Sequence, residues 1–233
     1  MTMLIAAAAV FLAIHLLVAG TRLRDSLTGM IGEGAYLGLF SLASVAAIVW
    51  LVMSYNTAQA GPDNRQLYDL GEAVHDLAIP VVLIAFLIGV PGLMMPNPTA
   101  VGQSAGAAKE ETVRGILRVT RHPFLWGVAI WSAYHLGANG DLASVILFGT
   151  LLALAQSGTF SIDAKRKRKL GEQWNAFASR TSNIPFGAIL TGRNSLKPGE
   201  YFDWRFFVAL FLFVAVLLGH TRFMGVSPFP GAF

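Results

Sequence analysis

The sequence contains no cysteine, which excludes a disulfide, a thiolate metal ligand, an iron–sulfur cluster and a cysteine nucleophile. Charged residues are also scarce, at 13 % of the 233 residues, whereas soluble domains have roughly 25 %. Apolar residues make up 55 % of the chain, and the mean hydropathy is +0.58. These values indicate a membrane protein that crosses the bilayer several times. No Walker or Rossmann glycine pattern is present.

Six apolar stretches are long enough, or nearly so, to cross a hydrocarbon core, which takes roughly 20 residues. They cover residues 3–19, 35–55, 73–95, 122–138, 142–160 and 204–223. We therefore predict an all-α fold, a polytopic membrane bundle of about six transmembrane helices that forms a single domain over residues 1–233. The short link Asn139-Gly140-Asp141 makes the fourth and fifth spans an antiparallel hairpin.

The net charge is +4, and the basic residues gather in three of the loops between spans. Only Arg65 and Arg222 of the 17 lysines and arginines fall on the other side. The positive-inside rule then predicts that these loops are cytoplasmic and that both termini are periplasmic, in a bacterial inner membrane. Residues 163–189 are interpreted as a basic amphipathic helix on the inner leaflet, so lipid and not nucleic acid is the expected partner.

Two smaller features have structural interpretations. Asp163 and Glu172 could form a catalytic carboxylate pair, but on a basic helix ordinary ion pairs with nearby lysines and arginines are favoured. Gly34 and Gly38 are expected to be contacts between helices.

The histidines are the main candidates for functional residues, because an imidazole inside lipid needs a partner. Counting residues along the spans places His15 and His122 at an inner level, and His75 and His135 at an outer one. His220 lies at the end of the last span, where water can solvate it. Each of these side chains could simply donate to a backbone carbonyl or to a carboxylate such as Asp76 or Asp141.

The functional alternative is axial ligation of haem iron, which uses neutral imidazoles from different helices of a bundle. Aromatic residues near His135, Trp131 among them, suit a flat apolar macrocycle, and Arg121 could neutralise a propionate. Matching depths favour the pairs His75 with His135 and His15 with His122, which would hold one or two haems of type b.

The chain resembles the NnrU family of bacterial membrane proteins, which is related to 15-cis-ζ-carotene isomerase. The matching residues are Arg121-His122-Pro123 with Gly127 and Trp131, then His135-Leu136-Gly137-Ala138-Asn139-Gly140-Asp141, together with His15, Arg22, Arg24, Gly34-Ala35-Tyr36, Phe40-Ser41 and His75. The resemblance covers about residues 1–190. It adds Asn139 to the candidate cofactor contacts.

This resemblance implies a haem-binding bundle. In the isomerase branch the proposed ligands correspond to His15 and His135, and the redox state of the iron governs isomerisation of a carotenoid double bond. Family members of the NnrU type occur with denitrification functions linked to nitric oxide, so a small hydrophobic molecule or a nitrogen oxide is the implied ligand. Ser132 stands where the isomerase has a cysteine, which excludes a ligand switch to sulfur. By residue counting the depths of His15 and His135 differ by about 10 Å, more than the roughly 4 Å between two axial nitrogens, so this pair requires helix tilt or a re-entrant first span.

A second resemblance is to the isoprenylcysteine methyltransferase family. Arg121-His122-Pro123 opens a span, and Leu170-Gly171-Glu172-Gln173-Trp174 leads to Ile184-Pro185-Phe186, as in those enzymes. It implies binding of S-adenosylmethionine at the cytoplasmic face, although the paired glutamates of that family are missing. A third hypothesis is an assembly factor or carrier without a cofactor.

Overall fold

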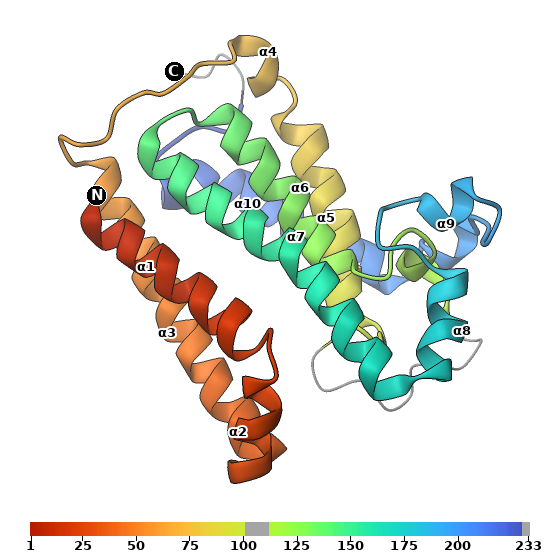
Figure 1. Ribbon diagram of the computed structural model, residues 1–233. Helices are drawn as coiled ribbons and strands as arrows, with labels where there is room; N and C mark the ends of the chain where they lie inside the picture. Colours follow the sequence, from red (N-terminus) through yellow and green to blue (C-terminus); the bar gives the residue numbers. More distant parts are fainter. Residues whose placement is uncertain (101–111, 230–233) are drawn as a thin grey trace.

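The computed structural model describes residues 1–100 and 112–229, which fold into helices (Figure 1). The long helices are α1 (Thr2–Ala13), α3 (Glu33–Gln59), α5 (Ala78–Met94), α6 (Pro123–Ala138), α7 (Leu142–Leu170) and α10 (Trp204–Met224). The short elements are the π-helix η1 (Ile14–Val18), α2 (Leu23–Ile31), α4 (Glu72–His75), the 3₁₀ helix η4 (Gly115–Arg118), α8 (Glu172–Arg180), α9 (Gly187–Leu190) and the 3₁₀ helix η5 (Pro198–Glu200). The predicted all-α fold is confirmed.

Four helical segments are long and apolar enough to cross a membrane by themselves, namely α3, Glu72–Met94, α7 and α10. A fifth candidate is the pair Thr2–Val18 and Leu23–Ile31, which is bent by 77°. The remaining predicted span is α6, whose 16 residues rise only about 24 Å. About six passes therefore agree with the structure, two of them being shorter or more bent than the sequence suggested.

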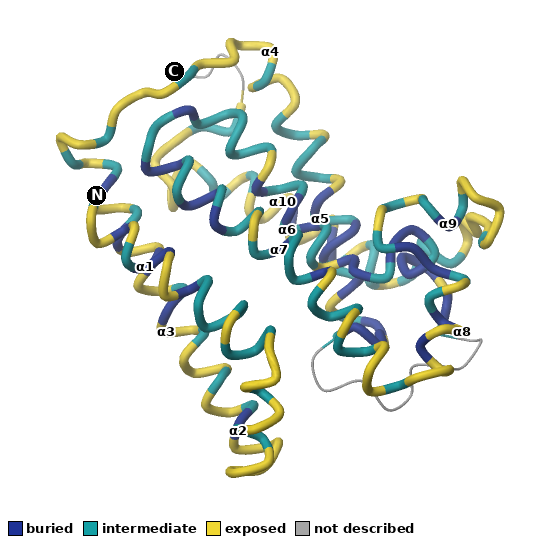
Figure 2. Tube along the Cα trace, in the orientation of Figure 1, coloured by how far each residue is buried: buried dark blue, intermediate teal, exposed yellow. Residues whose placement is uncertain are grey.

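The helices run between two ends of the bundle, which we name after the short helices found there (Figure 1). The α4 end holds α4 and the turn between α6 and α7, and the α8 end holds α8 and α9. Large apolar side chains on α3 and α10 are exposed along much of their length (Figure 2). In a polytopic membrane protein these surfaces are the ones that contact lipid.

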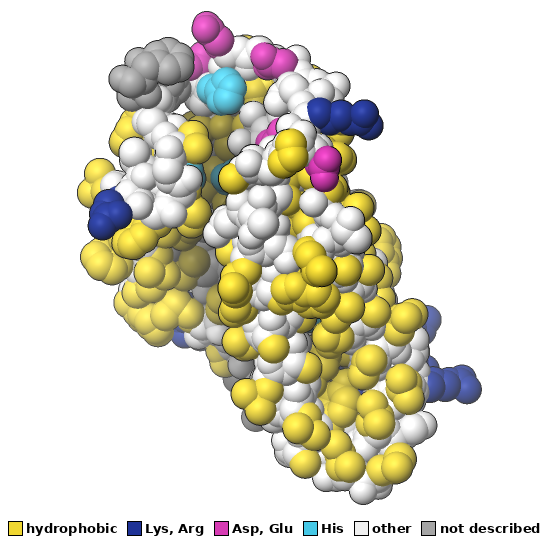
Figure 3. Space-filling model, turned by 90° about the vertical axis from the view of Figure 1, so that its left-hand side faces the viewer, with side chains coloured by type: hydrophobic (Ala, Val, Ile, Leu, Met, Phe, Trp, Pro, Cys, Tyr) yellow, Lys and Arg dark blue, Asp and Glu magenta, His cyan; other side chains and the backbone are white. Residues whose placement is uncertain are grey.

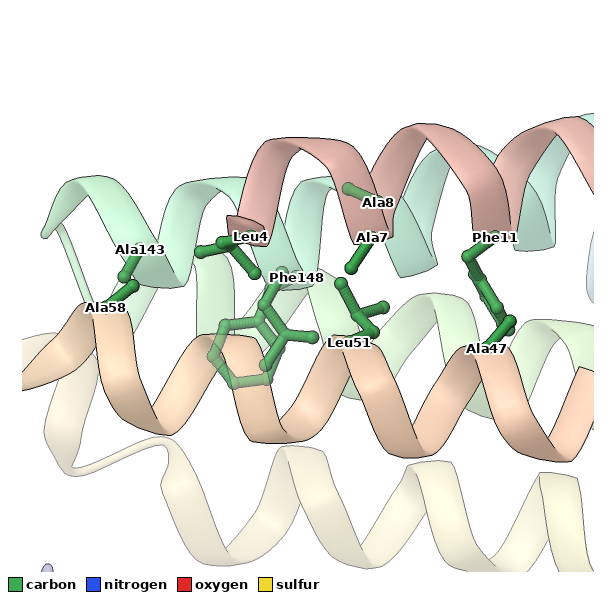
Figure 4. Packing of buried hydrophobic residues seen from close by; sticks show 10 residues of the cluster. Leu4, Ala7, Ala8, Phe11, Ala47, Leu51, Ala58, Ala143 and Phe148 are labelled. Carbon is green, nitrogen blue, oxygen red and sulfur yellow. The ribbon is translucent and has the colours of Figure 1, made fainter. Parts of the chain in front are cut away.

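The first core cluster joins α1, α3 and α7 (Figure 4). Small residues let the backbones approach, because Ala7, Ala47 and Ala143 are all buried at the contact. Leu51 of α3 and Phe148 of α7 fill the space between these alanines. Close packing of small and large side chains is what holds helices together where lipid supplies little hydrophobic drive.

Glycine controls the contact between α5 and α6. A Cβ added to Gly127 would lie 2.6 Å from the Cα of Gly89, and one added to Gly92 would lie 2.5 Å from Pro123. The two backbones are therefore as close as glycine allows. Gly34 and Gly38, which we expected at helix contacts, have nothing within 4 Å of such a Cβ. The sequence-based prediction therefore placed the packing glycines on α3, whereas the structure has them on α5 and α6.

The segment 163–189 differs from the single surface helix that we expected. α7 continues through the basic run of residues 165–169, and it ends at Gly171, where a backbone φ of 55° breaks the helix. α8 is the separate amphipathic helix, and it buries Trp174 and Phe177 against Val113. The basic run therefore extends a spanning helix.

At the α4 end, the loop before α4 is bound tightly to the turn between α6 and α7. The carbonyl oxygen of Gly140 accepts from the backbone N–H of Leu67 at 2.8 Å. A Cβ on Gly140 would lie 1.8 Å from the carbonyl oxygen of Tyr68, so only glycine fits there. Nearby, Gln59 donates to Asp141 and Ser144 at 3.0 and 2.9 Å. These contacts fix the last turn of α6.

Candidate functional site

His135 lies in the last turn of α6, at the α4 end. Its Nδ1 donates to the carbonyl oxygen of Trp131 at 2.8 Å. Its ring packs against Trp131, Phe148 and Tyr134, with centroid distances of 4.6, 4.9 and 5.2 Å. The side chain of Asn139 donates to the carbonyl oxygen of His135 at 2.9 Å. The imidazole is thus held in one orientation among aromatic rings.

The hydrogen bond to Trp131 determines which nitrogen of His135 is free. A carbonyl oxygen only accepts, so the proton of the neutral ring is on Nδ1. Nε2 keeps its lone pair, and no hydrogen-bond partner for it is found in the described part of the chain. Metal-binding histidines show this same arrangement, in which a backbone carbonyl orients the ring and fixes its tautomer.

His15 repeats the arrangement at another place. It belongs to the π-helix η1, and its Nδ1 donates to the carbonyl oxygen of Phe11 at 2.8 Å. Its ring packs against Phe11 and Phe40, with centroid distances of 4.5 and 5.4 Å. Single π-helical turns occur often at functional sites. His15 is therefore a second imidazole with an available Nε2.

The heights of His15 and His135 do not match. α1 and α7 run in the same direction (Figure 1), and Ser161 of α7 donates to the carbonyl oxygen of Gly20 at 3.5 Å. His15 is five residues before Gly20, so it lies about level with residue 156 of α7, which is five residues before Ser161. His135 contacts Phe148, roughly eight residues earlier still. The two imidazoles thus differ by roughly 12 Å along the bundle, whereas the axial nitrogens of one iron are roughly 4 Å apart.

The pairs expected from depth are not brought together either. His75 is exposed on α4, and no contact between His75 and His135 is found within residues 1–100 and 112–229. His122 is 2 % exposed at the start of α6, and its Nε2 donates to Asp163 of α7 at 2.7 Å. His15 and His122 therefore have separate partners.

Asp163 also binds Arg121, so three residues form one charged cluster at the α8 end. Nε of Arg121 donates to both carboxylate oxygens at 3.0 Å, and Nη2 makes a further short contact. The guanidinium carbon lies 5.7 Å from the ring centre of Trp174. Nδ1 of His122 is buried and has no partner among the described residues. The cluster anchors the start of α6 to α7.

Sequence reasoning missed this role of Asp163, which we expected to pair on its own helix. The partners lie 41 and 42 positions away. The sequence did contain a signal for this role of Asp163. Asp163 is a single acidic residue two positions before five consecutive basic ones, and it directly follows the second span of the predicted hairpin. Helix hairpins bring such positions opposite the start of the preceding helix.

The three predicted cofactor contacts therefore separate into two groups. Trp131 and Asn139 surround His135, whereas Arg121 lies at the opposite end of α6 and is committed to Asp163. Near His135, one further buried polar atom has no hydrogen-bond partner among the described residues. The hydroxyl of Ser132, a residue that is fully buried, makes no hydrogen bond in the described chain.

The imidazole nitrogens of His135 and His15 are donor atoms of the kind that haem iron binds. No group of three or more His, Asp or Glu side chains that could hold a metal ion occurs in the described residues. Haem iron needs only one or two protein ligands, because the porphyrin supplies the other four. An imidazole with an open Nε2 among aromatic rings meets that need at His135, and a similar one is found at His15.

Comparison with known proteins supports the membrane architecture. The profile of the family described as NnrU protein matches residues 3–228. The 15-cis-zeta-carotene isomerase of Zea mays chloroplasts is 29 % identical over 180 residues, and that of Arabidopsis thaliana chloroplasts is 30 % identical over 181. Each match covers 77 % of this chain but 48 % of the relative, so the chain spans about half their length. No solved structure matches.

The match covers every long helix described above, including α10, which lies beyond the region of resemblance that we identified from the motifs. It also includes the block from Arg121 to Asp141 that carries the cluster at one end of α6 and His135 at the other. With this coverage, the chain belongs to the NnrU family.

Proposed function

We propose that this protein binds haem b in the membrane and acts as an isomerase on an apolar polyene. The observation that supports the proposal most is the fixed tautomer of His135, which leaves Nε2 free among aromatic rings. The substrate class follows from the relatives, which are named as isomerases of 15-cis-zeta-carotene. Such a substrate is soluble in the bilayer that surrounds the helices.

The residues around His135 would position the cofactor. Trp131 and Phe148 contact the imidazole from α6 and α7, and their rings offer flat apolar surfaces. Asn139 holds the end of α6 through the carbonyl oxygen of His135. When bound, the haem would supply an iron with two accessible oxidation states. The chain has no cysteine, so no exchange of its protein ligand can involve a thiolate.

The test of haem binding is an absorption spectrum. Protein purified in detergent from haem-replete cells is expected to show a Soret band, and His135→Ala is expected to lose most of it. His75→Ala is the matched control, because His75 is an exposed histidine at the same end. A colourless wild-type protein, or a His135→Ala spectrum identical to that of the wild type, would contradict the proposal.

Isomerase activity needs a separate measurement. Protein in liposomes that contain a 15-cis polyene is expected to convert it to the trans isomer, as followed by chromatography, and His135→Ala is expected to abolish conversion. A link to nitric oxide, the other activity implied by family membership, predicts instead a shift of the Soret band when the reduced protein is exposed to the gas. Conversion without haem would contradict the haem-dependent mechanism.

The methyltransferase hypothesis depends on Arg121 and His122, and both donate to Asp163. Those internal bonds favour a structural role. We therefore expect no thermal stabilisation of the protein by S-adenosylmethionine. Stabilisation that His122→Ala removed would favour the methyltransferase instead.

The proposed location is a bacterial inner membrane with both termini in the periplasm, as the distribution of lysine and arginine predicts. The curated relatives are chloroplastic. Reporter fusions at the two termini test the orientation, and an alkaline phosphatase that is active at both ends is the expected result. Activity at only one end would contradict an even number of passes.

A further inference from the structure

A third histidine, His220 in the last turns of α10, has the same fixed tautomer as His135. Its Nδ1 donates to the carbonyl oxygen of Val226 at 2.8 Å. The chain turns back to make this bond at Gly225, whose φ of 75° is readily adopted only by glycine. Nε2 of His220 therefore also keeps its lone pair, and it has no hydrogen-bond partner in the described residues.

Contacts with α5 give the height of His220. Arg205, at the start of α10, donates to the carbonyl oxygen of Met94 at 3.2 Å. Eight residues further along α10, Phe213 packs on Phe86, which is eight residues before Met94, at a centroid distance of 5.9 Å. The helices are therefore antiparallel with a constant register. Continuing seven residues from Phe213 places His220 level with residue 79 of α5.

Contacts between α5 and α6 give the height of His135 in the same way. Gly127 lies against Gly89, and Pro123 lies against Gly92, so these helices are also antiparallel. His135 is eight residues beyond Gly127, which places it level with residue 81 of α5. Positions 79 and 81 differ by about 3 Å in height. His135 and His220 are therefore at nearly the same level, on two helices that both pack on α5.

The direction of the His220 side chain agrees with this placement. His220 follows Phe213 by seven residues, about two helical turns, so both side chains point from the same face of α10. That face meets α5, as the contact of Phe213 shows. The imidazoles of His135 and His220 are close enough to interact electrostatically. Figure 3 shows that the α4 end is hollowed on one face and that histidine side chains are visible inside the hollow.

We infer that His135 and His220, and not His135 and His15, are the two imidazoles that bind one metal centre from opposite sides. Their Nε2 atoms are both open, and their heights differ by about 3 Å, against roughly 12 Å for His135 and His15. The identity of the metal as haem iron rests on the proposed function. The convergence of the two imidazoles can be tested without haem.

The test without haem uses Cu²⁺ as a probe. One equivalent of Cu²⁺ is added to the haem-free protein in detergent, and electron paramagnetic resonance counts the nitrogen ligands. We expect two nitrogens, with Cu²⁺ affinity falling roughly tenfold or more in His135→Ala and in His220→Ala. His15→Ala and His75→Ala are the controls, and both should leave the signal unchanged.

A second variant guards against misfolding. His220→Asn keeps an amide nitrogen at the position of Nδ1, where it can donate to the carbonyl oxygen of Val226, but it supplies no imidazole. We expect it to fold with a thermal midpoint near that of the wild type and to lose one nitrogen from the Cu²⁺ signal. A Cu²⁺ signal that is unchanged in His220→Asn, or one that depends on His15, would overturn the inference.

The haem-loaded protein separates this inference from the proposed function. If haem binds, the ferric wild type should be low-spin with two imidazoles, and His220→Asn should become high-spin while keeping a Soret band. Added imidazole should restore the low-spin spectrum. A Soret band with a spin state that depends on His15 instead would overturn the pair but keep the proposed function. Two-nitrogen binding of Cu²⁺ in a protein that takes up no haem would keep the pair and contradict the proposed function.

Discussion

Nε2 of His122, at the start of α6, donates to Oδ1 of Asp163 in α7 at 2.7 Å. The two residues are 41 positions apart, and His122 is 2 % exposed. Arg121 binds the same carboxylate, so one acidic side chain satisfies two donors that the hairpin buries together. Removing one partner of a buried ion pair leaves the others without compensation, which is why this cluster is a sensitive point for stability.

We therefore expect Asp163→Ala to lower the free energy of unfolding by about 3 kcal/mol. Thermal unfolding in detergent, followed by circular dichroism, measures the effect. Glu172→Ala is the control, because the hydrogen bond that Glu172 accepts within the described residues comes from Asn175 on an exposed surface. Equal losses in the two variants would show that the cluster contributes no more than a surface contact.

The close approach of α5 and α6 leads to a second prediction. Gly127→Ala places a methyl group 2.6 Å from the Cα of Gly89. The helices must separate, which should destabilise the protein by about 1–3 kcal/mol. Gly38→Ala is the matched control, because a Cβ added there meets no other part of the described chain within 4 Å, and a helical alanine should stabilise the protein by about 0.5–1 kcal/mol. The prediction fails if both substitutions have effects of the same sign and size.

A third prediction concerns the polar network beside the turn between α6 and α7. Gln59 donates to Asp141 and Ser144, and its own oxygen accepts from Asn64 at 2.9 Å. Gln59→Ala removes these three hydrogen bonds from a partly buried network, so we expect a loss of about 1–3 kcal/mol in chemical denaturation. Gln66→Ala, which removes an exposed bond to the Tyr68 carbonyl oxygen, should have little effect. A larger loss in Gln66→Ala would contradict this assignment.

The ion pair between Arg118 and Glu200 predicts a dependence on pH. Nε and Nη2 of Arg118 donate to the two carboxylate oxygens at 2.7 and 3.0 Å. These hydrogen bonds hold the pKa of Glu200 below its ordinary value of 4.5. A lowered pKa in the folded state means that the stabilisation is fully present above the ordinary value, and that it is lost as the pH falls through the lowered pKa.

Glu200→Gln should therefore reduce the loss of stability between neutral pH and about pH 3.5. Thermal midpoints of the wild type and the variant at several pH values measure the difference. The variant should be less stable than the wild type at neutral pH and should approach it in acid. Parallel pH curves for the two proteins would show that the pair does not contribute to acid sensitivity.

Much of the fold could be predicted from the sequence, because each helix shows its apolar length locally. The spans and the hairpin at Asn139-Gly140-Asp141 follow from such local patterns. The prediction that Gly34 and Gly38 pack helices was wrong, because a glycine looks the same in the sequence whether its missing side chain faces another helix or open space.

The sequence by itself determined that this chain is a bundle of apolar helices whose histidines lie near its two ends, since hydropathy and residue counts are properties of one segment at a time. Only the tertiary structure decided which side chains meet. The register of α10 on α5 places His220 level with His135, and the hairpin brings Asp163 to His122. Both depend on side-chain contacts between helices that are distant in the sequence, and no single segment reveals such contacts.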